Sequence, residues 1–114
     1  MLLLITAARM PFYGGVQMPK AYWVTCYRSI SDPQKVAAYA KLAPLATAPF
    51  GARYIARGAA AAAFEAGQKE RIVISEFPSL EKAVAAYQSP AYQEALKALG
   101  NGAVRDIRIV EAME

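Results

Sequence analysis

The residue best suited to acid–base chemistry in this sequence is Glu76. It is one of the few among nine carboxylates that fall within a segment with strand character. A hairpin between the second and third predicted strands places Glu76 across from Arg53 or near Arg57. In an apolar cavity, a carboxylate beside an arginine can act in acid–base catalysis or bind an anion. At a sheet edge or dimer seam the same two residues form a structural ion pair, which is the commoner role of a buried carboxylate. Glu76 is the candidate catalytic residue, and Arg53 and Arg57 are candidate substrate-binding residues.

Two aromatic residues on the first predicted strand are further candidates for binding. Trp23 and Tyr27 lie on one face of this strand because they are four residues apart. They can form an aromatic wall for a planar ligand or, as the commoner alternative, the apolar core of an interface. Cys26 is the only cysteine and is expected to pack as a small hydrophobic residue.

Several kinds of site are excluded by composition. The sequence has no histidine and one cysteine, which removes Ser-His and Cys-His catalysis and thiolate metal clusters from within this chain. We therefore expect no metal and no cofactor. The net charge of +4 comes from lysines and arginines spread over every predicted element, so we expect no nucleic-acid binding.

The first seventeen residues differ from the rest. Residues 1–5 are apolar but far too few to span a membrane, and Arg9, Pro11 and two glycines interrupt the stretch after them. We interpret residues 1–17 as an N-terminal extension, with a degenerate export signal as the alternative, and residues 18–114 as the domain. A cytoplasmic protein without membrane contact is expected.

The domain shows the element order β-α-β-β-α-β. Strand patterns cover residues 20–28, 53–57, 71–77 and 104–111, and helix patterns begin after the caps Asp32, Ser79 and Ser89. Pro44 is expected to end or kink the first helix, the run 59–63 is a short strand or loop, and Leu80, Val84 and Tyr87 form the stripe of the second helix. This order predicts an α+β, ferredoxin-like fold: a four-stranded antiparallel sheet with two helices on one face.

The strands predict a homodimer. A sheet covered on one face should alternate apolar and polar residues, yet the strand at 20–28 is apolar or aromatic on both sides, and so is the strand at 71–77. The uncovered face would be a large apolar patch, for which a second copy is the simplest cover. The alternative is that residues 1–17 cover it. Arg105, Asp106 and Arg108 are typical of a solvated strand edge.

Five motifs in order resemble the domain of unknown function 1330 family. They are 18–24 (MPKAYWV), 32–33 (DP), 57–58 (RG), 76–79 (EFPS) with 87–92 (YQSPAY), and 105–107 (RDI) through 110–111 (VE). The resemblance implies a dimeric α/β barrel, in which ferredoxin-like subunits pair through their sheets. The chain departs from the family at Ala59, where a second glycine is common, and at Leu99 and Gly100, where an arginine is common.

The resemblance implies no single activity, because the superfamily includes monooxygenases, dismutases, haem-degrading enzymes, lactone isomerases and binding modules. Two functions from different classes remain open. The first is a dimer that binds or transforms a small apolar or anionic metabolite in a pocket between sheet and helices, with Glu76 and Arg57 supplying polarity. The alternative is a non-catalytic dimeric structural or interaction module. Whether the protein is an enzyme stays open.

Overall fold

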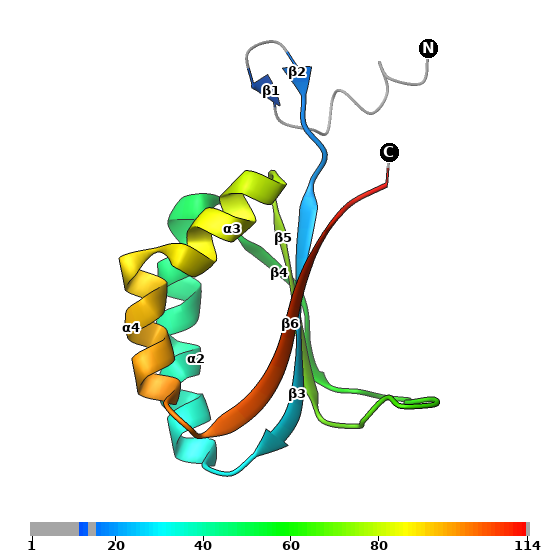
Figure 1. The fold of residues 1–114 in the computed structure, drawn as a ribbon, viewed down its shortest axis with the longest axis vertical. Helices are drawn as coiled ribbons and strands as arrows, with labels where there is room; N and C mark the ends of the chain where they lie inside the picture. Colours follow the sequence, from blue (N-terminus) through cyan, green and yellow to red (C-terminus); the bar gives the residue numbers. More distant parts are fainter. Residues whose placement is uncertain (1–11, 14–15, 114) are drawn as a thin grey trace.

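A computed structural model describes residues 12–13 and 16–113 of the protein (Figure 1). The elements are β1 (Phe12–Tyr13), β2 (Val16–Gln17), β3 (Ala21–Ile30), α2 (Pro33–Thr47), the 3-10 helix η1 (Ala48–Phe50), β4 (Arg53–Ala59), β5 (Arg71–Phe77), α3 (Leu80–Gln88), α4 (Pro90–Leu99) and β6 (Ala103–Glu111). The last four strands form one antiparallel sheet in the order β4-β5-β3-β6, and the three α-helices lie on one face of it. The predicted α+β fold and element order are confirmed. Most of the predicted extension, residues 1–17, lies outside the described residues.

The helices begin where the sequence predicts. The side chains of Asp32, Ser79 and Ser89 each accept a hydrogen bond from a backbone amide in the first turn of the next helix. Such caps satisfy N–H groups that have no partner within the helix. Ser89 also separates α3 from α4, because its extended backbone breaks the helical path before Pro90.

The structure differs from two expectations about the helices. Of the two outcomes expected at Pro44, an end of the helix is wrong, because α2 continues to Thr47, where the side chain donates a hydrogen bond to the carbonyl of Ala43 at 3.0 Å. In α3, Val84 is 38% exposed, and the fully buried positions are Ala83 and Ala86. The small alanine side chains let α3 approach β3, β5 and β6, so the larger Val84 is turned away from the sheet.

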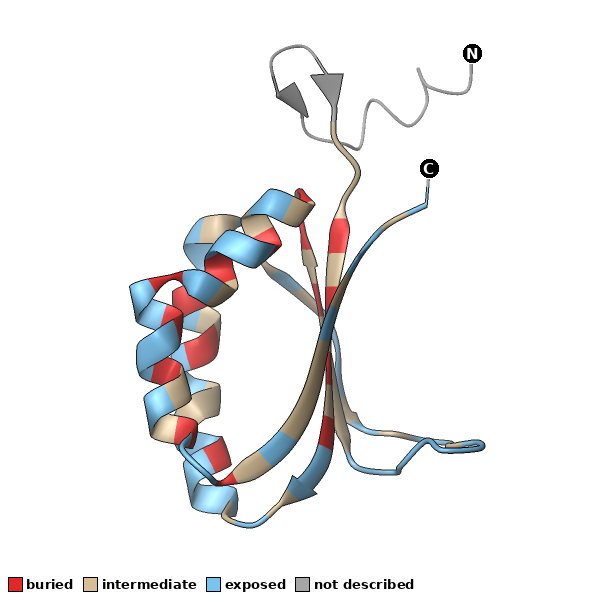
Figure 2. Cartoon of the chain, in the orientation of Figure 1, coloured by how far each residue is buried: buried red, intermediate tan, exposed pale blue. Residues whose placement is uncertain are grey.

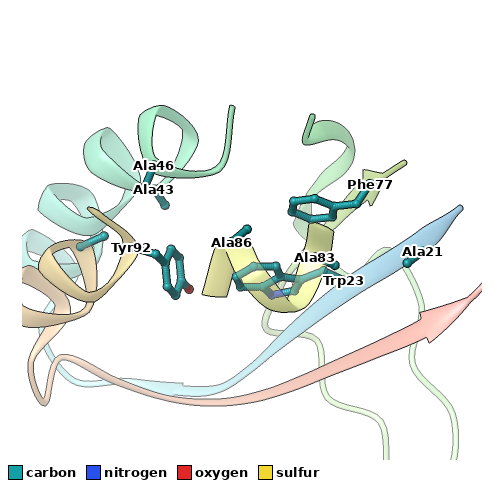
Figure 3. Close-up of a cluster of buried hydrophobic side chains, with 9 residues drawn as sticks. Ala21, Trp23, Ala43, Ala46, Phe77, Ala83, Ala86 and Tyr92 are labelled. Atoms are coloured by element: carbon teal, nitrogen blue, oxygen red, sulfur yellow. The ribbon is translucent and has the colours of Figure 1, made fainter. Parts of the chain in front are cut away.

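The core of the subunit is aromatic. Trp23 projects from β3 toward the helices and stacks on Phe77 with ring centroids 5.8 Å apart, while Tyr92 meets it edge-on at 5.1 Å (Figure 3). Tyr92 and Phe77 are among the largest fully buried side chains. The commoner role expected for Trp23, packing in an interface between subunits, is therefore wrong, because this residue fills the interior of one subunit.

The sheet has an inner face toward the helices and an outer face away from them. Trp23, Thr25 and Tyr27 are buried on the inner face, and Val24 and Cys26 between them are half-buried on the outer face. Figure 2 shows the buried segments on the helices and along the sheet. No helix among the described residues covers the outer face. The loop 60–70, which includes most of the alanine run, extends from β4 and β5 away from the helices.

Candidate functional site

A pocket lies on the inner face of the sheet, beneath α2 and α4. Its lining combines five aromatic residues, three arginines and three hydroxyl side chains: Trp23, Tyr27, Tyr39, Tyr54, Tyr92, Arg57, Arg71, Arg105, Thr25, Thr47 and Ser75. We call it the inner pocket. The space open to the centres of water molecules is about 30 Å³, which is room for about two waters at roughly 10–15 Å³ each. Ala40 and Pro44 of α2 complete the lining together with Ala43 and Val73.

Strand register brings two of the arginines together around Tyr27. Tyr27 of β3 pairs directly with Arg105 of β6. On the other side of β3, the neighbouring pair is Cys26 with Ile72, which places Arg71 beside Tyr27 on the same face. Arg57 of β4 pairs with Val73, one row further along. An antiparallel sheet with this register therefore directs all three guanidinium groups to the inner face.

Arg105 is held between aromatic rings. Its guanidinium carbon lies 4.5 Å from the ring centroid of Tyr39 on α2 and 5.5 Å from that of Tyr27 on β3. Burial lowers the pKa of Arg105, but the electrostatic interaction with Tyr39 and Tyr92 more than offsets this and leaves the pKa above its usual range. The group is thus a permanent cation inside an aromatic enclosure.

Two pairs of hydroxyl groups complete the inner pocket. The hydroxyls of Tyr39 and Tyr92 lie 2.6 Å apart, and those of Thr47 and Tyr54 lie 3.2 Å apart. Burial raises the pKa of both Tyr54 and Tyr92, so these phenols stay protonated at neutral pH. Neither the described lining nor the wider sequence offers a histidine, and no carboxylate lines the described pocket, so the inner pocket is equipped to bind rather than to abstract protons near pH 7.

Glu76, expected in this pocket, lies on the outer face instead. The predicted hairpin forms with Glu76 opposite Arg53, and the two side chains make an ion pair at 3.4 Å. Glu76 also accepts hydrogen bonds from Tyr22 at 3.1 Å and Lys20 at 3.4 Å. Burial raises the pKa of Glu76, but the Tyr22 hydrogen bond and the two cations outweigh it and lower the pKa overall.

The placement of Glu76 separates the expected site residues into two groups. Trp23, Tyr27 and Arg57 line the inner pocket. Glu76 and Arg53 belong to the outer face, where the strand alternation directs them. The expected use of Glu76 together with Arg57 in one pocket is therefore wrong, and Glu76 makes the ion pair at the sheet that the sequence analysis gave as its commoner role.

The outer face carries a wider groove between the sheet and loop 60–70. Its volume is about 620 Å³, and its apolar part includes Val24, Ile72 and Val110. Phe64, in the loop, is 81% exposed. Asp106 lies at the rim, where Arg28 and Arg108 each contact it at 3.1 Å.

Two further kinds of feature are absent from the residues that the structure describes: a cluster of metal ligands and a membrane-spanning helix. No three of the residues Asp, Glu, Cys and His come together there as ligands for a metal ion. No helix there is long and apolar enough to cross a membrane.

Comparison with protein families decides where the chain belongs. The model of the family described as Domain of unknown function (DUF1330) matches residues 20–113. The chain belongs to this family. No curated protein matches the chain.

Solved structures share the fold of this DUF1330 protein. A protein of unknown function from Rhodopseudomonas palustris, RPA0582, has a TM-score of 0.67 at 16% identity, over 86% of this chain and 85% of its own. A dimeric ferredoxin-like protein of unknown function from Thermobifida fusca has a TM-score of 0.58 at 18% identity, over 91% and 99%. SnoaB, a cofactor-independent oxygenase from Streptomyces nogalater, has a TM-score of 0.61 at 10% identity, over 84% and 95%. At these identities the likeness shows a ferredoxin-like fold.

Sequence reasoning missed Arg71 and Arg105 in the DUF1330 chain. Arg105 was expected at a solvated strand edge with Asp106 and Arg108, but only those two residues lie there. The signal was present in the alternation of β6, because Arg105 shares its face with Ile107 and Ile109, both of which pack near the core. A charged residue in phase with two apolar ones on a strand indicates an inward-facing charge.

Proposed function

We propose that this DUF1330 protein binds a small metabolite of apolar or anionic character in the inner pocket. The observation that carries the proposal is the lining itself: aromatic rings and three arginines face one cavity within the helix-covered side of the sheet. A site that served only packing would be filled by apolar side chains. Small-molecule sites usually combine an apolar wall with a few convergent polar groups, and at about 30 Å³ this one admits a very small ligand or the polar end of a larger one.

We also propose that the protein works as a homodimer joined through the outer faces of two sheets. The support is the half-buried or exposed apolar row on β3, β5 and β6, which includes Val24, Ile74 and the 59%-exposed Val110. Ion pairs border this row at both ends, at Glu76 and at Asp106. An apolar centre with a polar rim is the anatomy of a protein–protein interface. The inner pocket then belongs to each subunit separately.

The test of binding is a thermal-shift screen of the purified protein against a metabolite library. A ligand of the inner pocket should raise the unfolding temperature of the wild type. The shift should be lost in Ala40→Trp, which fills the lining from α2, and reduced in Arg57→Ala. It should persist in Glu76→Gln, which alters the outer face only.

The outcomes separate the two functions. A shift that survives Ala40→Trp would place the ligand elsewhere and overturn the assignment of the inner pocket. A library in which no compound shifts the wild type would overturn the binding function and favour the non-catalytic module.

A further inference from the structure

Among the described residues, the basic groups of the inner pocket have no acidic partner. Arg57, Arg71 and Arg105 take part in none of the ion pairs among the described residues, whose carboxylates are Glu76, Glu94 and Asp106. The Nε of Arg71 and the Nη1 of Arg105 are buried and find no acceptor in the described part of the chain. Buried donors without acceptors are costly, and charged ones more so. A ligand that supplies acceptor oxygens removes this cost.

Thr25 offers a hydroxyl hydrogen to the pocket, whereas the hydrogens of Thr47 and Tyr54 are used within the protein. Thr47 uses its hydrogen on the carbonyl of Ala43 at 3.0 Å, so Tyr54 must donate to Thr47 across their 3.2 Å contact. Thr25 accepts a hydrogen bond from the indole nitrogen of Trp23 at 2.9 Å. The hydrogen of Thr25 is therefore left to donate into the pocket.

The tyrosine pair supplies a further donor. In the 2.6 Å contact between Tyr39 and Tyr92 only one hydrogen lies between the two oxygens, so one hydroxyl keeps a hydrogen for another acceptor. With Thr25, Arg71 and Arg105 this makes a set of donors that face a cavity without a carboxylate in its described lining. The chemistry of the lining selects an anion that accepts several hydrogen bonds.

We propose that the inner pocket is a carboxylate receptor, in which Arg71 and Arg105 bind the carboxylate of a small organic acid. The inference rests on the proposed binding function and names its ligand class. The cavity admits about two waters by volume, which corresponds to the two oxygens of one carboxylate. The planar guanidinium groups match such a group with paired hydrogen bonds.

The rest of the acid has a defined path. The aromatic rings of Tyr27 and Tyr39 border the carboxylate site and suit a short apolar or planar substituent. Arg57 of β4 lines the same pocket and is exposed, so a longer acid extends toward this side chain. The carboxylate alone fills the cavity, and the substituent of a short or aromatic acid lies against the tyrosine rings.

The experiment is calorimetric titration of the full-length protein at constant ionic strength. The probes are acetate, propionate and benzoate, with acetamide and benzamide as neutral counterparts and inorganic phosphate as a tetrahedral anion. We expect a carboxylate to bind at least tenfold more tightly than its amide. Phosphate should bind more weakly than the best carboxylate, because it has no apolar part to place against the rings of Tyr27 and Tyr39 and would bury further charged oxygens there.

The variants are Arg71→Met and Arg105→Met, with Arg108→Met as the matched control. Arg108 is on the same strand as Arg105 but on the outer face, where its side chain is 79% exposed. We expect carboxylate affinity to fall on the order of tenfold or more in the two pocket variants and to stay unchanged in the control. If Arg105→Met does not fold, Arg105→Lys, which keeps the charge but loses the planar fork, should weaken binding to a lesser degree.

Three results would overturn the carboxylate assignment: amides that bind as tightly as acids, phosphate that binds more tightly than every carboxylate, or unchanged affinity in both pocket variants. If, in these cases, a neutral ligand binds the wild type but not Ala40→Trp, the proposed binding function stands and only the ligand class is wrong. If every ligand binds Ala40→Trp as tightly as the wild type, the proposed binding in the inner pocket fails as well.

Discussion

The guanidinium carbon of Arg105 lies 4.5 Å from the ring centroid of Tyr39, and this contact joins the edge strand β6 to α2 across the inner pocket. Cation–π contacts of this kind contribute about 1–2 kcal/mol when shielded from water. Its Nη1 nevertheless finds no acceptor among the described residues, and a buried donor without a partner costs about 1–3 kcal/mol that the ring contact does not recover. Arg105 therefore stabilises the fold less than an apolar residue of similar length would.

We predict that Arg105→Met makes the free protein more stable. Methionine keeps an unbranched side chain against the tyrosines and removes the buried charge, so the free energy of unfolding should rise by about 1 kcal/mol. Urea unfolding measures this, with Arg108→Met as the control that should change stability by less than about 0.5 kcal/mol. A loss of more than about 1 kcal/mol in Arg105→Met would show that Arg105 is structural. A gain, together with lost binding, is the signature of a functional residue.

The Tyr39–Tyr92 hydroxyl pair predicts a loss of stability at alkaline pH. Burial raises the pKa of Tyr92 in the folded protein above the 10.0 of an ordinary tyrosine. The folded state therefore holds its proton more tightly than the unfolded state. This contribution is complete below pH 10 and is lost as the pH rises above 10 toward the folded pKa.

We expect Tyr92→Phe to lower the free energy of unfolding at pH 7 by about 1 kcal/mol, because the hydroxyl of Tyr39 loses its partner. Above pH 10 the same variant should lose stability less steeply than the wild type. Urea unfolding from pH 7 to 11 measures both effects. Parallel pH curves for the two proteins would contradict the assignment of the alkaline loss to Tyr92.

The fold was predictable because its signals are local. The caps at Asp32, Ser79 and Ser89 and the β-branched and aromatic composition of the strand at 20–28 depend on neighbouring residues alone. Pro44 does not end α2, because a proline removes only one helical hydrogen bond and α2 is long enough to continue beyond it.

The site was predictable only in part. The face on which Glu76 lies is set by its parity with Ile72 and Ile74, but the sequence did not show which face the helices cover. In the sequence both faces of the sheet look apolar. The face that the helices cover decides whether Glu76 or Arg71 enters the pocket. Packing of the small side chains of α3 on the face of Trp23 settles it, and that is a property of the assembled fold.

The Glu76 cluster predicts a loss of stability in acid. Its pKa is lowered from the ordinary 4.5, since the Tyr22 hydrogen bond and the charges of Lys20 and Arg53 outweigh burial. A carboxylate with a depressed folded pKa stabilises the protein above pH 4.5, and this contribution is lost as the pH falls through the folded pKa. Acidification below pH 4 should therefore lower the free energy of unfolding, because Glu76 loses its charge.

We expect Glu76→Gln to lower the free energy of unfolding at pH 7 by about 0.5–1 kcal/mol, and the difference from wild type to shrink as the pH falls below 4.5. Glu94→Gln is the matched control. Glu94 and Lys97 pair on the surface of α4, where they are 67% and 76% exposed, so this change should have almost no effect. Chemical unfolding at pH 7 and pH 3.5 makes the comparison. A difference that stays constant with pH would exclude the ion pairs as its source.

The outer face predicts the state of assembly. Val24 lies at its centre, between Ile74 of β5 and Arg108 of β6. We expect the wild type to sediment as a dimer at micromolar concentration and Val24→Arg to sediment as a monomer, because an arginine there places two like charges in an apolar interface. Circular dichroism checks that the variant remains folded.

Val84→Arg is the matched control, since Val84 is 38% exposed on α3, a helix on the opposite side of the sheet. It introduces the same charge and should remain a dimer. A wild type that sediments as a monomer would contradict the proposed pairing, and a Val24→Arg dimer would move the interface to another surface. Because the inner pocket lies wholly within one subunit, a folded Val24→Arg monomer should retain carboxylate binding, which separates assembly from ligand recognition.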